Sequence, residues 1–82
     1  MYYIYIVKCI DDTYYTGFTN NIEKRIHAHN EKKGAKYTRG RTPVKLVYSE
    51  QFEDKKDALK REYEIKKFTR SKKERLILKQ DN

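Results

Sequence analysis

The spacing of hydrophobic positions along the chain predicts two strands at its start. Residues 2–10 read YYIYIVKCI, with apolar or aromatic side chains at both parities as far as Lys8. Aromatic and β-branched residues favour a strand, and apolar side chains at both parities indicate a strand covered on both faces. Residues 14–19 read YYTGFT and are expected to form the returning strand of a hairpin.

The turn between these strands determines which side chains share a face. Residues 11–13 are Asp-Asp-Thr, which is turn chemistry. A three-residue loop would pair Ile10 with Tyr14. Because directly opposed residues share a face, an odd number of loop residues places Tyr5 and Tyr15 on the same face. We therefore predict a three-residue loop and one face that carries both tyrosines.

Gly17 interrupts the second predicted strand. A glycine inside a strand indicates a bulge or a close backbone approach. A simple packing gap beneath a helix would explain it equally well, and the sequence leaves both interpretations open.

A helix is predicted to start at residues 20–23 and to run to about Lys32. Asn20 can act as its N-cap, Glu23 can complete a capping box, and Gly34 lies beyond its end as a stop.

One stripe of this helix mixes apolar and basic side chains: Ile22, Arg25, Ile26 and His29. Such a stripe does not have the composition of a plain core face. Arg25 and His29 are one helical turn apart, so both side chains can reach the same point.

Residues 32–41 are expected to form a basic loop. The segment contains five basic residues and two glycines. Basic side chains on a loop suit contacts with phosphate groups. An ordinary solvated loop is the alternative.

Beyond Pro43 the pattern predicts a third strand and a last helix. The strand covers residues 44–52, with Val44, Leu46 and Tyr48 on one parity. A capping box at residues 71–74 (Ser-Lys-Lys-Glu) opens a short final helix.

Between them, a helix is predicted over about residues 55–68, with Asp54 as its N-cap. Ala58, Glu62 and Ile65 fall on one stripe of this helix. A carboxylate inside an apolar stripe costs several kcal/mol unless it is paired or binds a metal. The pattern leaves open a structural ion pair and a metal-binding or catalytic role for Glu62.

The predicted elements follow the order β-β-α-β-α-α. We expect an α+β fold in which a small three-stranded antiparallel sheet is flanked by helices. At 82 residues, the chain is expected to form a single domain over residues 1–82.

Charge suggests the kind of partner. The net charge is +8, which points to a polyanion and above all to nucleic acid, although a ribosomal or merely soluble basic protein would share it. Aromatic residues make up 13% of the chain, which is too many for a disordered basic tail. DNA and RNA are not distinguished at this stage.

The single cysteine excludes several possibilities. Cys9 allows no disulfide within the chain and no zinc site built from thiolates, and it is expected to be a small core residue. No stretch approaches the roughly 18 apolar residues of a membrane helix, and the N-terminus does not have the pattern of a signal peptide. We therefore expect a cytoplasmic protein with no membrane association, as a monomer or a weak homodimer.

The chain resembles the GIY-YIG nuclease domain family in an ordered set of residues: Tyr3-Ile4-Tyr5, Tyr15-Thr16-Gly17, Arg25, His29 and Glu62. The two tripeptides match the motifs that name the family. Tyr3 replaces the opening glycine and Thr16 the middle residue of the second motif, and neither change removes a functional side chain. The resemblance covers essentially the whole chain. Residues 34–41 and 47–50 resemble, more narrowly, the small stand-alone bacterial branch of uncharacterised proteins.

The resemblance implies metal-dependent, endonuclease-type hydrolysis of nucleic-acid phosphodiester bonds, on DNA in repair or recombination. Glu62 would hold one divalent ion, Mg²⁺ or alternatively Mn²⁺, and Mg²⁺ commonly keeps most of its waters. Arg25 stands at the family's essential arginine and would stabilise developing charge. Tyr5 would orient or deprotonate the attacking water. Tyr15 and His29 would position water and phosphate or relay a proton.

The flanking nucleic-acid backbone would be held by basic residues: Lys24, Lys33, Lys36, Arg39 and Arg41. A plainer interpretation makes Tyr5 and Tyr15 core tyrosines and joins Arg25 to Glu62 in a salt bridge. The alternative function is a nucleic-acid-binding module with weak or no catalysis. A third is an adaptor whose basic face meets an acidic protein.

Overall fold

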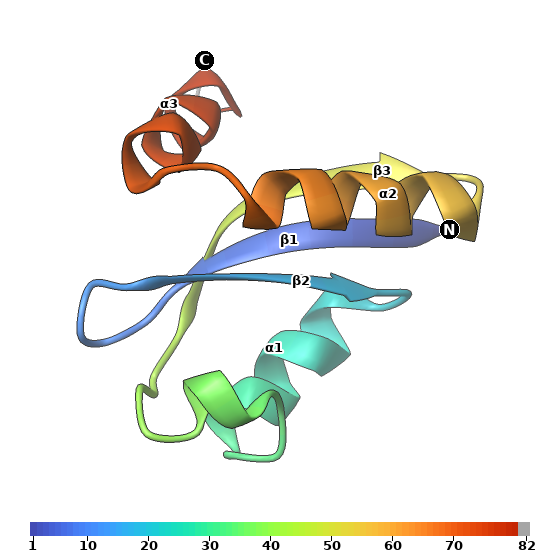
Figure 1. The fold of residues 1–82 in the computed structure, drawn as a ribbon. Helices are drawn as coiled ribbons and strands as arrows, with labels where there is room; N and C mark the ends of the chain where they lie inside the picture. Colours follow the sequence, from blue (N-terminus) through green and yellow to red (C-terminus); the bar gives the residue numbers. More distant parts are fainter. Residues whose placement is uncertain (81–82) are drawn as a thin grey trace.

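The computed structural model describes residues 1–80, which form three strands and three α-helices (Figure 1). In chain order, the elements are β1 (Tyr2–Lys8), β2 (Tyr14–Thr19), α1 (Ile22–Asn30), the 3₁₀ helix η1 (Lys36–Thr38), β3 (Lys45–Phe52), α2 (Lys55–Lys66) and α3 (Arg70–Gln80). The strands are antiparallel in one sheet. The predicted α+β fold and the order β-β-α-β-α-α are confirmed.

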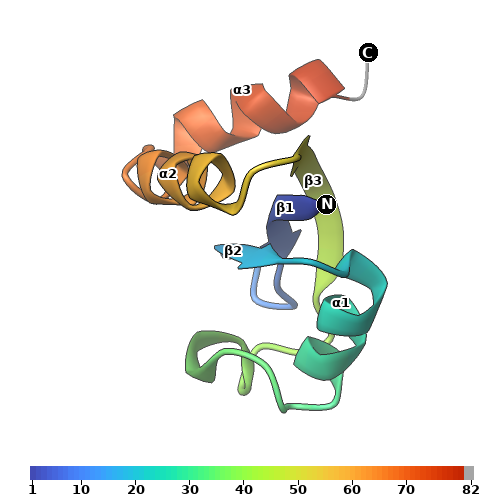
Figure 2. The ribbon, with the colours of Figure 1, turned by 90° about the vertical axis from the view of Figure 1, so that its right-hand side faces the viewer.

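The first strand lies at the centre of the sheet, in the order β2-β1-β3. Helix α1 lies against one face, and α2 and α3 lie against the other (Figures 1 and 2). On β1, Ile4 and Ile6 face α2, whereas Tyr5 and Val7 face α1. All four side chains are fully buried, which confirms that this strand is covered on both faces.

The hairpin loop is longer than predicted. Lys8 pairs with Tyr14, so residues 9–13 form a five-residue loop, and the predicted three-residue loop is wrong. The Asp11 carboxylate accepts hydrogen bonds from the backbone N–H and the hydroxyl of Thr13, at 3.2 and 2.6 Å. The pairing is displaced by two residues from the predicted register, in which Ile10 would lie opposite Tyr14.

The five-residue loop also has an odd number of residues, so Tyr5 and Tyr15 lie on the same face, as predicted. Tyr5 lies opposite Gly17 and Val7 lies opposite Tyr15. Both tyrosines therefore point towards α1. Cys9, just beyond β1, is buried on the same side, as expected.

Strand β3 contains a bulge that the alternation did not reveal. Its register with β1 shifts between Ile6, which pairs with Tyr48, and Val7, which pairs with Leu46. Val44, Leu46 and Tyr48 share one parity but not one face, because an extra residue in one strand inverts the alternation. Tyr48 packs towards α2, and Val44 packs towards α1.

The ends of α1 also differ from the prediction. The N-cap is Asn21, not Asn20, and its side chain accepts a hydrogen bond from the Lys24 backbone N–H at 3.1 Å. The helix ends at Asn30, two residues before the predicted end at Lys32. Lys32 has a φ of 64°, which is outside the helical range and turns the chain away.

The caps of the other helices were predicted with mixed success. Asp54 caps α2 as expected, accepting a hydrogen bond from the Lys56 backbone N–H at 2.9 Å, although the helix ends at Lys66 and not at residue 68. Helix α3 begins one residue before Ser71. The hydroxyl of Thr69 accepts from the Lys72 backbone N–H at 3.2 Å, so Thr69 takes the capping role assigned to Ser71.

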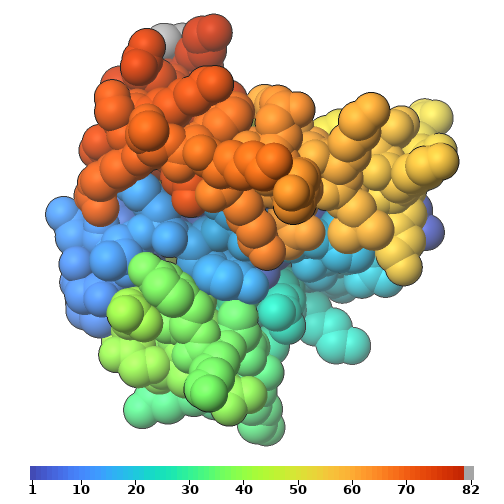
Figure 3. All heavy atoms as spheres, in the orientation of Figure 1, coloured from blue at the N-terminus to red at the C-terminus, as the bar shows by residue number. Residues whose placement is uncertain are grey.

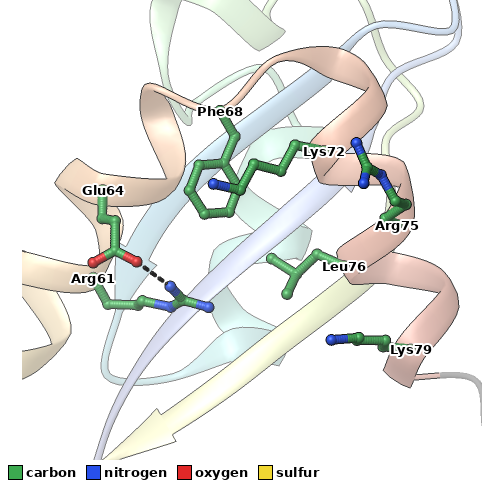
Figure 4. A pocket seen from close by; sticks show the side chains of 7 residues that line it. All are labelled: Arg61, Glu64, Phe68, Lys72, Arg75, Leu76 and Lys79. Carbon is green, nitrogen blue, oxygen red and sulfur yellow. Dashed lines mark hydrogen bonds and ion pairs between the residues drawn. The ribbon is translucent and has the colours of Figure 1, made fainter.

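A hollow of about 500 Å³ lies between α2 and α3 (Figure 4). Its lining consists of Arg61, Glu64, Phe68, Lys72, Arg75, Leu76 and Lys79. The guanidinium of Arg61 is held by the carboxylates of Glu50 and Glu64. The hollow therefore has a fixed ion-pair network at one side and three further basic side chains at the other.

Within the described residues, no helix has the length and apolar character that crossing a membrane requires.

Candidate active site

Three of the expected site residues meet at the phenol oxygen of Tyr5. It accepts a hydrogen bond from Nε of Arg25 at 3.2 Å and lies 2.7 Å from Nε2 of His29. Tyr5 comes from the central strand, and the other two come from the mixed stripe of α1. The stripe therefore delivers both basic side chains to one point, as the one-turn spacing predicted.

The other ring nitrogen of His29 contacts a residue that the sequence did not single out. Nδ1 lies 2.8 Å from Oγ1 of Thr38, and that hydroxyl donates to the Ala35 carbonyl at 2.9 Å. His29 and Thr38 are both fully buried. The only available signal for Thr38 was its place in the segment 34–41 that resembles the small-protein branch.

Tyr15 lies beside this cluster and is only half-buried. Its ring meets the His29 ring edge-on, with centroids 5.5 Å apart, and stacks on Tyr37 at 5.8 Å. Tyr15 also faces the Arg25 guanidinium. The pKa of Arg25 is raised, first by the hydrogen bond to Tyr5, while burial opposes the rise and Tyr15 adds to it. Both phenols therefore favour the charged guanidinium.

Two glycines make room for the contact between Tyr5 and His29. A Cβ at Gly17 would collide with the Tyr5 hydroxyl, and a Cβ at Gly34 would collide with Nδ1 of His29. Gly17 pairs with Tyr5 in a regular register, so there is no bulge at this point. The open question about Gly17 is answered: the glycine provides space for the Tyr5 ring.

Burial keeps both partners of the buried pair neutral. The pKa of Tyr5 is raised chiefly by burial, although the hydrogen bond and the charge of Arg25 oppose the rise. The pKa of His29 is lowered, first by burial and then by the charge of Arg25. At neutral pH the site therefore holds a neutral phenol and a neutral imidazole next to a charged guanidinium.

Glu62 approaches from the opposite face of the sheet, on α2. Its side chain is 18% exposed, and its carboxylate lies 3.4 Å from Nζ of Lys66. The charge of Glu62 is the weakest of the causes that raise the pKa of Tyr5, and no hydrogen bond joins the two side chains within the described residues. Among the described residues Glu62 forms no ion pair with Arg25, so the plain salt bridge is not observed.

Strand β2 forms the edge of the sheet that lies between α2 and the α1 cluster. In Figure 3, atoms of the first two strands are visible between α2 above and the green segment of the thirties and forties below. The two flanking elements come from opposite sides of the sheet (Figure 2). A ligand at this edge would therefore meet α2 on one side and the α1 cluster on the other.

The residues present fit a hydrated divalent ion and not a fully protein-ligated one. No group of three or more His, Cys, Asp or Glu side chains in the described part of the chain could hold a metal. Mg²⁺ commonly takes one or two carboxylates and keeps several waters. Glu62, with part of its carboxylate open to solvent, can supply such a single ligand.

The residues predicted to bind the nucleic-acid backbone are not all equally available for a phosphate contact. Lys24 lines a hollow of about 240 Å³ next to Arg25. Lys33, Lys36 and Arg39 are exposed, and none forms an ion pair within the described residues.

Arg41 is different, because its guanidinium already has partners. Nε contacts the Asp11 carboxylate at 2.9 Å, Nη1 donates to the Tyr37 carbonyl at 2.7 Å, and the group lies 4.1 Å over the Tyr37 ring. Arg41 therefore ties the 32–41 segment to the hairpin loop.

The remaining motif residues, Tyr3, Ile4 and Thr16, lie outside the hydrogen-bonded cluster. Ile4 is fully buried beneath α2, and Tyr3 is half-buried and lines a separate hollow next to α1. Thr16 is buried, and its hydroxyl has no hydrogen-bond partner among the described residues. None of the three contacts the Tyr5–His29 pair by a hydrogen bond within that part of the chain.

The chain is similar to known proteins over most of its length. The sequence-family model of the GIY-YIG catalytic domain matches residues 1–75 of this chain. The chain is 65% identical to a UPF0213 protein of Clostridium perfringens, covering 94% of this chain and 83% of the relative. It is 54% identical to a UPF0213 protein of Natronomonas pharaonis, covering 93% and 89%. Similar proteins thus occur in archaea as well as in bacteria.

Two solved structures are also similar. The NMR structure of a UPF0213 protein from Bacillus halodurans gives a TM-score of 0.61 at 47% identity, covering 94% of this chain and 83% of that one. An NMR structure of a protein from E. faecalis gives a TM-score of 0.61 at 41% identity, covering 90% and 79%.

Proposed function

Because this chain belongs to the GIY-YIG catalytic domain family, we propose that it is a metal-dependent endonuclease that hydrolyses phosphodiester bonds in DNA. The observation that supports this most directly is the cluster in which Arg25 and His29 meet at the phenol oxygen of Tyr5. The domain implies a nuclease family. The metal, the DNA substrate and a role in repair or recombination belong to the proposal.

Arg25 supplies the fixed positive charge that the reaction needs. Phosphodiester hydrolysis builds negative charge on the phosphoryl oxygens, and preorganised donors stabilise it. Nε of Arg25 is bound to Tyr5, which leaves the two terminal nitrogens of the planar guanidinium for a phosphate.

The two phenols have different surroundings and therefore different roles. Tyr5 is fully buried, and burial raises its pKa, so it holds Arg25 and remains neutral. Tyr15 is half-buried beside the same guanidinium, so it is the phenol that an attacking water can reach. His29 keeps both rings in place through its hydrogen bond and its edge-on contact.

Glu62 would hold the divalent ion, Mg²⁺ or Mn²⁺, together with water. When bound, the ion would polarise a phosphoryl oxygen. Lys24, Lys33, Lys36 and Arg39 would contact the flanking backbone, since these side chains are exposed. We place the protein in the cytoplasm as a monomer.

The test is cleavage of nicked, flapped and single-stranded DNA by the purified protein with Mg²⁺ or Mn²⁺. Arg25→Ala and Glu62→Gln should each lower the rate by at least about a hundredfold, in the range seen when one transition-state donor is removed. Lys66→Gln is the matched control for Glu62, because it removes the ion-pair partner and keeps the carboxylate. Equal rates for wild type, Arg25→Ala and Glu62→Gln would exclude the proposal.

A second candidate is a nucleic-acid-binding module with little or no catalysis. It is favoured by the net charge of +8 and by the single carboxylate at the site. This candidate predicts salt-dependent binding without metal-dependent cutting. Fluorescence anisotropy over a salt series, run next to the cleavage assay, separates the two.

A further inference from the structure

Thr38 has a chemical environment that the proposed roles do not explain. It lies on η1, in a segment whose neighbours are exposed, and yet its side chain is fully buried. Its hydroxyl makes two hydrogen bonds, one with His29 and one with the Ala35 carbonyl. A valine would fill the same volume, so packing alone does not require a hydroxyl here.

The hydrogen-bond partners determine where each proton lies. The Thr38 hydroxyl has one hydrogen, which it donates to Ala35, so it can only accept from Nδ1 of His29. Because burial and Arg25 keep the imidazole neutral, its other nitrogen, Nε2, carries a lone pair. Tyr5 must then donate its only proton to Nε2.

The same count of hydrogen-bond donors and acceptors determines the bond between Tyr5 and Arg25. With its hydrogen directed at His29, the Tyr5 oxygen presents only lone pairs to its remaining neighbour. That neighbour is the Nε–H of Arg25, at 3.2 Å. Every hydrogen bond in this series then has one donor and one acceptor, and the donors all point in the same direction, from Arg25 towards Ala35.

The opposite tautomer of His29 would disturb this arrangement. Nε2–H would donate to the Tyr5 oxygen, and the phenol hydrogen would then have to turn towards the Arg25 side. Two donors would face each other there, in a buried setting where an unmatched donor costs about 1–3 kcal/mol. Arg25 would lose the acceptor that orients it.

We propose that Thr38 is a positioning residue for Arg25. Its hydroxyl holds His29 in the tautomer with a proton on Nδ1, and this makes Tyr5 an acceptor for the Nε–H of Arg25. The terminal nitrogens of Arg25, with four N–H donors, are then left for Tyr15 and for a phosphate of the nucleic-acid backbone. The inference deepens the proposed function and rests on it for the identity of the phosphate.

The surroundings of His29 leave its ring little freedom to change partners. Gly34 packs directly against the ring at Nδ1, and Tyr15 meets the ring from β2. The charged and titratable groups facing the imidazole are Arg25 on its own helix, Tyr5 on β1 and Tyr15 on β2. None of these offers Nδ1 an acceptor in place of Thr38.

The first measurement needs no substitution. Nitrogen-15 spectra of the His29 ring distinguish protonated from unprotonated nitrogens, and wild type should show the proton on Nδ1 at neutral pH. A proton on Nε2, or an even mixture of tautomers, overturns the inference whether or not the protein cuts DNA.

The second measurement compares Thr38→Val, which removes the hydroxyl at nearly constant volume, with Thr38→Ser, which keeps it. Thr38→Val should lose the single His29 tautomer and broaden the Arg25 Nε–H signal. Its cleavage rate should fall about 10–100-fold, the range seen when a hydrogen-bond partner that orients a metal-bound histidine is removed, with KM for DNA unchanged. Thr38→Ser should restore the single His29 tautomer, the Arg25 Nε–H signal and the cleavage rate.

Each outcome of the comparison is decisive. Wild-type cleavage by Thr38→Val, with wild type active, overturns the inference. Where Thr38→Val does not fold, Thr38→Ala takes its place in the same comparison. Should wild type cut no DNA at all, the proposed function fails, and the His29 and Arg25 spectra alone decide whether Thr38 orients the guanidinium.

Discussion

Gly17 and Gly34 show how two missing side chains create the site. Each glycine lies against one end of the Tyr5–His29 hydrogen bond, and a Cβ at either position would collide with that pair. Gly17 belongs to the second family motif, so the structure gives a steric reason for a glycine at that point of the motif. The reason lies in a ring from the neighbouring strand and not in backbone conformation, because neither glycine has a positive φ.

Alanine at either glycine should therefore break the buried pair. We expect Gly17→Ala and Gly34→Ala each to destabilise the fold by about 1–3 kcal/mol, as overpacked cores do, and to abolish most of the cleavage. Urea unfolding and the cleavage assay measure the two effects. Gly40→Ala is the matched control, since nothing lies within 4 Å of a Cβ there. Equal behaviour of the three variants would contradict the steric explanation.

His29 should make stability depend on pH on the acid side. Its pKa in the fold is lowered by burial and by Arg25, whereas in the unfolded chain it titrates near its ordinary value of about 6.5. Below about pH 6.5 the unfolded chain therefore takes up a proton that the folded chain refuses. The contribution of His29 to stability is complete above that pH and is lost as the pH falls.

Urea unfolding between pH 5 and pH 8 measures this dependence. The slope of unfolding free energy against pH should become shallower in His29→Gln. His27→Gln is the control on the same helix, because that side chain is 74% exposed and lies outside the buried cluster. If both variants keep the wild-type slope, His29 does not titrate in the way that its burial predicts.

At the scale of elements, helix α1 matters most, because it carries Arg25 and His29. Asn21 caps it and Asn20 does not, although the two residues are identical and adjacent. We expect Asn21→Ala to cost about 1 kcal/mol of unfolding free energy, the usual cost of losing an N-cap, and Asn20→Ala to cost little. Denaturant midpoints of the two variants test this, and a larger loss in Asn20→Ala would refute the assigned cap.

The element boundaries also show what local patterns reveal. Apolar periodicity and capping residues together identified the three strands and three α-helices of the described residues, because burial on one face leaves a periodic trace and a cap has a local chemistry. Their ends were less accurate: the hairpin loop and the start of α1 each involve a side-chain hydrogen bond that competes with a neighbouring alternative, and an extra residue in β3 shifts its register with β1. Such competition between adjacent residues of similar chemistry leaves no clear periodic signal.

At the scale of the whole molecule, basic side chains lie on both sides of the sheet. The 32–41 segment lies on the α1 side, and the hollow between α2 and α3 lies on the other (Figures 2 and 4). The position of Tyr5, Arg25 and Thr38 on the α1 side suggests that the first of these surfaces holds the substrate backbone near the site.

Two triple variants with equal charge change separate these surfaces. Lys33→Gln/Lys36→Gln/Arg39→Gln should weaken DNA binding and reduce the slope of log affinity against log salt by about 2–3. Lys72→Gln/Arg75→Gln/Lys79→Gln should have the smaller effect. Anisotropy titrations from low to moderate salt measure both. Equal losses would mean that net charge, and not the 32–41 segment, governs binding.

The sequence by itself determined the fold class and the order of elements, and it pointed to all the residues proposed for the site except Thr38. It could do so because periodicity reports burial and because the two motifs, Arg25, His29 and Glu62 stand in a recognisable order. It also predicted correctly that Tyr5 and Tyr15 share a face, because that depends only on whether the loop length is odd.

Only the tertiary structure decided how those residues differ from one another. Two identical side chains differ in their surroundings. Tyr5 is a buried, neutral phenol because it lies on the central strand, and Tyr15 is half-buried because it lies on the neighbouring edge strand. Thr38 became important only through its contact with His29, nine positions away. Burial and hydrogen-bond direction arise from contacts between distant segments, and no local pattern in the chain contains them.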